Sequence, residues 1–508
     1  MLKSIPLSQW GDVQLSHLLN RAGFGKAPAQ GAPDVGAGPE AWVDRLLDTP
    51  ARMNPSDEPE WVKGTNYSEK MMRNFRDLPE TERRTKLKEM QRMNRQHVQS
   101  VREWWLDRIL RSEEPLQEKL TLFWHGHFVS SSQKVKVGKH HWIQNNLLRY
   151  RGLGSFRDLT VAIGRDPAML IYLDGARSQK GSPNENYARE LMELFTLGEG
   201  HYTEDDIKAA ARAFTGRLAG RYSDKSTLAP RQFDRGEKTF FGQTGRFDDA
   251  DIVDIILQQQ QASRYITRKL WEYFAYAHPE PEIVDSLALT FRENDYQLKP
   301  VLREMFLSQQ FYSKKAVRTQ IKSPVMWLAS LARVLDLDPF PTKIGTRVLD
   351  QLGQQLLNPP SVKGWDGGRA WVSTTTLIMR NNLAHLLING GSPGKAGLTG
   401  RIREIPQAVM DAMSEQQKQR LETMQQRAKF VEIPSLLRNK SLVAQWRKTS
   451  ATEKLPLLVR TVYQGPISSA SYSTLEKNPN LLLNSSNLPE ALQQSIYELV
   501  AHPEFQLT

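Results

Sequence analysis

Apolar residues recur along most of the chain at the three- and four-residue spacing of an amphipathic helix. The pattern is clearest in residues 79–111, where Val98, Val101, Trp105 and Ile109 form one apolar stripe. Similar patterns predict further helices at 12–24, 115–128, 140–150, 155–164, 184–197, 204–216, 249–260, 262–276, 280–293, 297–307, 324–336 and 375–388. Because alternating, strand-like segments are scarce, the sequence predicts a mainly α protein with a large multi-helix globular body.

Two segments break the helical pattern. Residues 230–246 combine aromatic residues and glycines without a helical period, which predicts a small β-hairpin or extended excursion. Residues 358–374 are dense in Pro, Gly and Trp, so we expect an ordered loop there. A glycine-rich stretch and a change of composition follow. They divide the chain into a main body, 1–395, and a smaller helical part, 396–508, that we expect to pack on the body.

Composition narrows the possible chemistry. The 508 residues include no Cys, which excludes disulfides, thiolate nucleophiles and Cys metal sites. The net charge of +12 favours contact with polyanions, but the 56 acidic residues are interspersed among the 68 basic ones. This mixture favours a solvated basic surface over nucleic-acid binding by the basic segment 82–111.

Several signals are missing from the sequence. No apolar run is long enough for a signal peptide or a membrane span, so the cytoplasm is the default expectation. The G-x-S-x-G, Walker, Rossmann and H-E-x-x-H patterns do not occur. Nucleotide hydrolysis, dinucleotide redox chemistry and esterase chemistry of the serine type are therefore not favoured.

The first candidate site is the segment FWHGHFVSS, residues 123–131, with His125 and His127 two positions apart. In extended backbone both imidazoles would point to one face and could bind one metal ion. On a helix they would diverge by roughly 200°. Gly126 could end the preceding helix and so allow the extended form. The alternative is a pair of histidines packed among the neighbouring aromatic residues, one of them hydrogen-bonded.

The second candidate is the helix predicted for NENYARELMELFTLG, residues 184–198, where Asn186, Glu190 and Glu193 share one side. Two neighbouring carboxylates can bind a hard metal ion, or divide the roles of acid and base. The alternative is structural, because Arg189 stands four residues from an acid on either side and could form two ordinary ion pairs.

The third candidate is the loop at 358–374. Trp365 and Trp371, separated by glycines that allow unusual backbone angles, could form a stacking platform for a sugar ring or a base. Lys363 stands beside them as a binding candidate. The alternative is a buried loop that its tryptophans anchor.

Several of these blocks occur together in one known family. HLLNRAGFG, FWHGHFVSS, NENYARELMELFTLGEGHYTEDDIKAAARAFTGR and NPPSVKGWDGG, in this order, resemble the bacterial family called domain of unknown function 1800. The resemblance implies one large helical domain and no established activity. Members are often exported, and are often encoded beside a protein of the domain of unknown function 1501 family, which is similar to phosphatase-like and sulfatase-like enzymes. From the N-terminal residues we expect no signal sequence, which departs from the exported members, and the chain reads WHGH where the family usually reads WHNH, with both histidines retained.

Two functions remain open from the sequence. The first is a metal-dependent hydrolase, in which His125 and His127 bind a divalent metal with Glu190 or Glu193, and the other carboxylate acts as general base. Arg189 belongs to the same catalytic group. The alternative is a non-catalytic binding or assembly partner of a phosphatase-like or sulfatase-like enzyme, such as a domain of unknown function 1501 protein, acting on an anionic polymer. The first function requires the histidines and carboxylates to converge on a common hollow.

Overall fold

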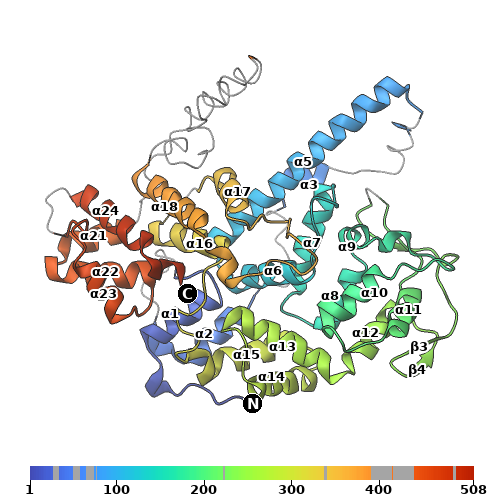
Figure 1. Cartoon of the computed structure of the whole chain (residues 1–508), viewed down its shortest axis with the longest axis horizontal. Helices are drawn as coiled ribbons and strands as arrows, with labels where there is room; N and C mark the ends of the chain where they lie inside the picture. Colours follow the sequence, from blue (N-terminus) through green and yellow to red (C-terminus); the bar gives the residue numbers. More distant parts are fainter. Residues whose placement is uncertain are drawn as a thin grey trace. The chain divides into compact units, whose positions relative to one another are not determined.

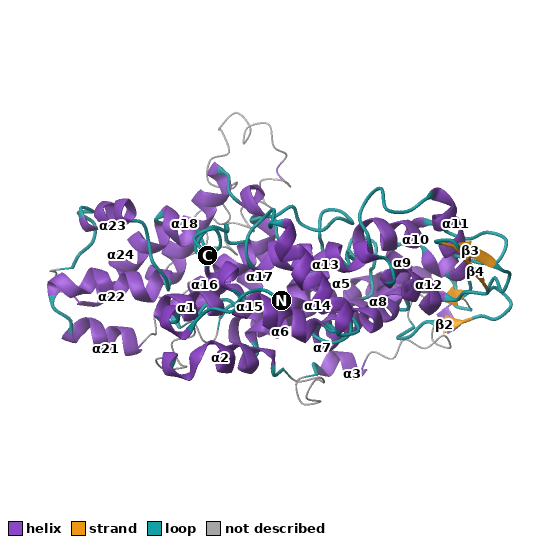
Figure 2. Ribbon diagram, turned by 90° about the horizontal axis from the view of Figure 1, so that it is seen from below, coloured by secondary structure: helices purple, strands orange, loops and turns teal. Residues whose placement is uncertain are grey.

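The computed structural model describes residues 1–26, 34–49, 58–64, 74–75, 77–220, 223–336, 340–390, 415, 440–483 and 488–508. The fold is mainly α, as the sequence predicts (Figures 1 and 2). The chain forms two compact units. Unit 1 comprises Met1–Leu7, Ala37–Ser313 and Gln355–Asp366, and unit 2 comprises Ser8–Gly36, Lys314–Gln354 and Gly367–Thr508. The boundary expected near residue 395 lies outside the described residues.

Unit 1 carries all of the candidate site residues except Trp371. Its α-helices are α2 (Gly38–Leu47), α3 (Glu60–Gly64), α5 (Glu80–Arg111), α6 (Pro115–His127), α7 (Gly138–Arg151), α8 (Phe156–Gly164), α9 (Pro167–Tyr172), α10 (Asn186–Glu190), α11 (Glu204–Ala213), α12 (Asp249–Leu257), α13 (Gln260–Phe274), α14 (Pro281–Glu293) and α15 (Leu298–Leu307). A π-helix, Leu191–Thr196, continues α10. Helix α7 packs against α5 and α6, and α13 packs against α14.

The core of unit 1 follows the apolar stripes seen in the sequence. The predicted stripe of α5 is buried, with Val101, Trp105 and Ile109 fully covered. Each fully buried aromatic or aliphatic side chain of this kind contributes roughly 1.5–3 kcal/mol relative to an exposed position. The polar half of α5 does not pack in this way, and its residues Glu80 to Glu89 are mostly exposed.

Two small antiparallel sheets extend from unit 1. Strand β1 (Arg217–Leu218) pairs with β2 (Thr227–Leu228), and β3 (Lys238–Phe240) pairs with β4 (Gln243–Gly245). The second pair is the hairpin predicted within 230–246. Its two-residue turn has positive φ at both Phe241 and Gly242, as hairpins with primed turns require.

Unit 2 is also helical, with α1 (Asp12–Arg21), α16 (Pro324–Leu335), α17 (Thr342–Gln351), α18 (Thr374–Asn389), α21 (Lys440–Lys448), α22 (Ala451–Tyr463), α23 (Ser469–Glu476) and α24 (Leu488–Ala501). Helix α24 packs against α18 and α22. The buried guanidinium of Arg380 donates to the side chain of Gln506 at 2.6 Å and to the carbonyl of Lys322 at 3.1 Å. In the described part of the chain, every helix is too short or too polar to cross a lipid bilayer.

Candidate functional site

Both histidines of the first candidate lie on a helix. Helix α6 continues through Gly126 and ends at His127, so the extended segment that would bring the two imidazoles to one face does not form. With 3.6 residues per turn, the side chains of His125 and His127 leave the helix roughly 200° apart. Among the residues that the structure describes, no three His, Asp or Glu side chains are grouped so that they could hold a metal ion.

His127 is buried and bonded to the backbone of the second candidate segment. Its Nε2 lies 3.0 Å from the carbonyl oxygen of Phe195. A carbonyl only accepts, so we assign the proton to Nε2 of a neutral ring. Burial lowers the pKa of His127 well below its ordinary value, and the positive charge of Lys269 acts in the same direction. His127 therefore links α6 to the π-helix as a neutral donor.

His125 lies in a different environment. Its ring meets Trp105 edge-on, with 5.2 Å between ring centroids, and lies 5.8 Å from the ring of Trp365. Burial lowers the pKa of His125 to about 3, and the charges of His141 and Arg102 contribute less. Its Nε2 has no hydrogen-bond partner within the described chain. The two imidazoles thus have separate surroundings: His127 is hydrogen-bonded to Phe195, and His125 packs against two tryptophans.

The π-helix Leu191–Thr196 is the unusual backbone feature of the second candidate segment. Carbonyl groups in and after this wide turn accept from side chains of α6 and α13: Tyr265 Oη bonds Leu194 at 2.9 Å, His127 Nε2 bonds Phe195 at 3.0 Å, and Gln261 Nε2 bonds Leu197 at 3.0 Å. Single π turns are rare and occur frequently at functional sites. Here three side chains from elsewhere in unit 1 hold the turn in place.

The two carboxylates flank the start of this turn. Glu190 ends α10 and Glu193 lies within the π-helix, and both are half-buried. The Tyr202 hydroxyl donates to Glu193 Oε2 at 3.0 Å. Burial raises the pKa of Glu190, and the charge of Glu193 adds to this shift, while Lys363 and Arg189 oppose it. Glu193, Lys363 and Arg189 therefore all lie within electrostatic reach of Glu190.

Arg189 forms its ion pairs with residues other than Glu190 and Glu193. Its guanidinium donates to both carboxylate oxygens of Glu204, at 2.7 and 2.9 Å, and lies 3.5 Å from Glu185. The ion pair with the acid four residues earlier is present, and no pair with Glu193 forms within the described chain. Asn186 is exposed at the first turn of α10, where its backbone N–H donates to the side chain of Asn184. The guanidinium of Arg189 is thus oriented by Glu204 and Glu185.

The Trp-containing loop brings Lys363 to this region. Gly364 has φ +89°, and a Cβ at this position would lie 2.3 Å from the carbonyl oxygen of Gly126. The backbone of the loop therefore approaches α6 as closely as only glycine permits. Trp365 packs over Gly126, and the Lys363 ammonium lies 3.4 Å from Glu199 in an exposed ion pair.

Trp365 and Trp371 belong to different units. Trp365 is half-buried in unit 1, whereas Trp371 belongs to unit 2 and is only 7 % exposed. A ligand ring therefore has little access to Trp371.

The sequence did not indicate two parts of this site. The π-helix leaves no periodic signal, because it inserts a single wide turn into an otherwise helical pattern. Tyr202 stands just before the capping box of Thr203 and Asp206 that begins α11. The capping box can be recognised in the sequence, and it places Tyr202 directly before α11. It does not reveal that the Tyr202 hydroxyl contacts Glu193.

The chain was compared with curated proteins, solved structures and protein families. No curated protein and no solved structure matches the chain. The family described as "Protein of unknown function (DUF1800)" matches residues 17–507, nearly the whole chain. The chain therefore belongs to the DUF1800 family.

Proposed function

We propose that this protein is a hydrolase in which Glu190 and Glu193 form the acid–base pair. The observation that carries the proposal is the position of both carboxylates at a π turn held by Tyr265, His127 and Gln261. A turn fixed by packed side chains holds its functional groups more precisely than a free loop does. The chemistry is assigned to the carboxylates because His125 and His127 diverge on α6.

The two carboxylates have unequal surroundings, which is the arrangement that separates an acid from a base. Tyr202 donates a hydrogen bond to Glu193 and fixes its orientation. Glu190 accepts no hydrogen bond from the described residues, and burial raises its pKa. Glu190 is therefore the proton donor to the leaving group, and Glu193 is the base that activates water.

The nearby cations favour a negatively charged substrate. The positive charges of Lys363 and Arg189 oppose the rise in the pKa of Glu190. Lys363 is largely exposed on the loop that covers the end of α6. Protonation of a leaving oxygen by one carboxyl group, with water activated by a second, is the chemistry of glycosidic-bond hydrolysis. A linkage within an anionic glycan is the substrate class that meets both conditions.

The test is a panel of chromogenic substrates: uronides, sulfated and neutral glycosides, phosphate esters and sulfate esters. Positioned acid or base groups contribute on the order of 10²–10⁴-fold. We expect turnover of an anionic glycoside by the wild type and at least about 100-fold less by Glu190→Gln and by Glu193→Gln. Glu237→Gln is the matched control, because Glu237 is an exposed glutamate that is not among the charges acting on Glu190, and it should not change the rate. Turnover that survives Glu190→Gln, or a wild type inactive on the whole panel, would contradict the proposal.

A non-catalytic role as partner of a domain of unknown function 1501 protein on an anionic polymer stays a prediction from the sequence. Its structural support is a feature separate from the carboxylate pair, a cationic cavity along α5.

A further inference from the structure

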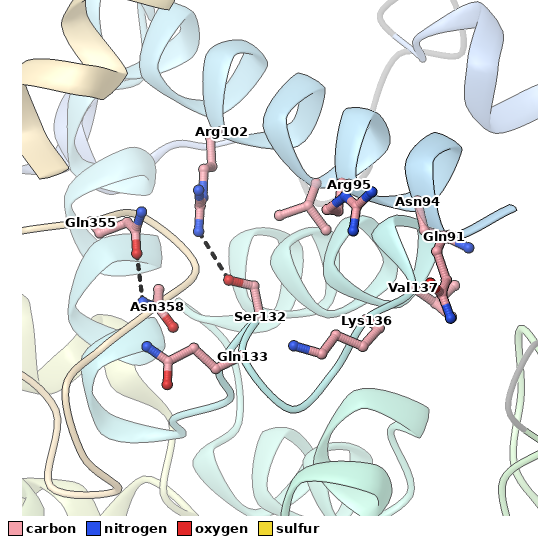
Figure 3. Close-up of a pocket in the computed structure, with 11 residues that line it drawn as sticks. Gln91, Asn94, Arg95, Arg102, Ser132, Gln133, Lys136, Val137, Gln355 and Asn358 are labelled. Atoms are coloured by element: carbon pink, nitrogen blue, oxygen red, sulfur yellow. Dashed lines mark hydrogen bonds between the residues drawn. The ribbon is translucent and has the colours of Figure 1, made fainter. Parts of the chain in front are cut away.

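Unit 1 contains a cavity of about 620 Å³ between α5, the loop 131–137 and the segment 355–358 (Figure 3). This volume lies within the range of roughly 300–1,000 Å³ found for small-molecule sites. Most of the described residues that line it are of polar types: Gln91, Asn94, Arg95, Val98, Arg102, Ser132, Gln133, Lys136, Val137, Gln355 and Asn358. No residue of the Glu190 and Glu193 site takes part.

The described lining residues carry positive charge. Arg95, Arg102 and Lys136 line the cavity, and none of the other lining residues that the structure describes is Asp or Glu. Arg95 and Lys136 are exposed, and neither forms an ion pair within the described part of the chain. Arg165 of the same unit, by contrast, binds both oxygens of Asp249. The cavity therefore offers the unpaired charges of Arg95 and Lys136 to an anionic group.

One of these cations is held in a fixed orientation. The Nε of Arg102 donates to the carbonyl of Leu356 at 2.8 Å, and its Nη2 donates to Ser132 Oγ at 2.9 Å (Figure 3). The Ser132 N–H in turn donates to the carbonyl of Leu357 at 2.9 Å. These bonds tie three chain segments together around one guanidinium. A guanidinium fixed in this way loses little side-chain entropy when an anion binds.

The rest of the lining suits hydroxyl groups. Five carboxamides surround the cations, and each carboxamide has both a donor and an acceptor. Asn358 is itself oriented by hydrogen bonds with Gln355 and Ser131. No aromatic side chain lines the cavity within the described chain, so a nucleobase finds no stacking surface there. Amides and cations without aromatic rings favour an anionic sugar over a nucleotide.

We propose that this cavity binds an anionic saccharide unit, a sugar that carries a phosphate, sulfate or carboxylate group. Arg95, Arg102 and Lys136 bind the anionic group, and the carboxamides bind the hydroxyls. The site goes beyond the proposed hydrolase, because it needs neither carboxylate of the pair and would serve a purely binding protein equally well.

The test is titration calorimetry on the full chain at low salt. The probes are glucose 6-phosphate, glucose 6-sulfate and glucuronic acid, with glucose and inorganic phosphate for comparison. At least one anionic sugar should bind, and should bind at least about tenfold more tightly than glucose or phosphate alone. The three anionic probes distinguish which group the cations prefer. Affinity should fall as salt rises, because the cations at the rim are exposed.

Variants locate the binding. The double variant Arg95→Gln, Lys136→Gln removes two exposed side chains without ion pairs and so leaves the fold intact, and it should weaken binding at least about tenfold. Arg92→Gln, an exposed arginine of α5 outside the lining, should bind as the wild type does. Glu190→Gln should also bind normally, which separates failure of this site from failure of the hydrolase. Absence of binding by all three anionic sugars, equal binding of glucose or phosphate, or unchanged binding by the double variant would overturn the proposal.

Discussion

The imidazole of His127 donates to the carbonyl of Phe195 across 3.0 Å and thereby joins α6 to the π-helix. Replacing His127 with Leu keeps a buried side chain of similar size but leaves this carbonyl without its donor. A buried polar group deprived of its partner costs about 1–3 kcal/mol. We therefore expect His127→Leu to lower the free energy of unfolding by that amount, measured by urea denaturation.

His125→Leu is the matched control. His125 Nε2 has no partner in the described chain, and its ring packs among tryptophans. Volume-conserving apolar changes usually cost less than about 1.5 kcal/mol. If His125→Leu lowered the free energy of unfolding as much as His127→Leu does, the result would contradict the assignment of one hydrogen-bonded and one packed imidazole.

The approach of Gly364 to Gly126 predicts a second effect. Gly364→Ala would force a Cβ to 2.3 Å from a backbone oxygen, so the loop must move away from α6 and carry Lys363 with it. Positive φ alone costs roughly 1–2 kcal/mol for an alanine, and the clash adds to this cost. We expect a lower melting temperature and, because Lys363 shifts, a changed pKa of Glu190.

Gly181→Ala separates strain from contact. Gly181 has a similar φ of +85°, but a Cβ there would meet nothing within 4 Å. Gly181→Ala should therefore lower the melting temperature only by the effect of the strained backbone. If both variants lowered the melting temperature equally, the close approach of the loop to α6 would not contribute to stability.

A buried acid predicts a pH dependence of stability. Asp166 caps α9 and accepts hydrogen bonds from the Met169 N–H and from Gln144 Nε2, both at 2.9 Å. Burial raises the pKa of Asp166 from 3.8 to about 7, against the effect of these bonds. Between these two values the folded protein binds the proton and the unfolded chain does not. Stability from this residue is therefore present below pH 3.8 and is lost as pH rises, by about 1.4 kcal/mol per unit up to pH 7.

Asp166→Asn keeps the acceptor that caps α9 and removes the titration. We expect the free energy of unfolding of the variant, relative to wild type, to increase steadily from pH 4 to pH 7. Buried histidines such as His141 have the opposite effect, because its lowered pKa of about 4 makes stability rise with pH. This effect is the same in both proteins, so it cancels when the free energy of unfolding of the wild type is subtracted from that of the variant. A difference that stays constant over this range is the result that speaks against the raised pKa.

The sequence predicted the elements whose signals are local. The apolar stripe of α5 placed Val101 and Trp105 in the core, and the glycine-rich segment 230–246 contains the predicted hairpin. Gly126 was a misleading signal. Glycine suggests a helix end, but α6 continues through this position, where Trp365 and Gly364 pack against it. The role of Gly126 depends on a segment more than 200 residues away, which no local pattern reveals.

The cavity could not be predicted for the same reason. It needs residues 91–102, 131–137 and 355–358 to meet, and each of these segments on its own resembles an ordinary polar surface. The candidate carboxylates were found because Glu190 and Glu193 are close in sequence. The proximity of Lys363 to them follows only from the packing of the loop on α6.

The proposed function requires Glu190 and Glu193 to lie so close that the charge of Glu193 raises the pKa of Glu190, in the same direction as burial does. The most direct measurement is a carbon-13 NMR titration of glutamate side-chain carboxyls, with the Glu190 signal assigned from its absence in Glu190→Gln. We expect the pKa of Glu190 to lie above the ordinary value of 4.5, and to be lower in Glu193→Gln than in the wild type, because the neighbouring negative charge is gone. A Glu190 pKa at or below 4.5, or one that Glu193→Gln leaves unchanged, would contradict it.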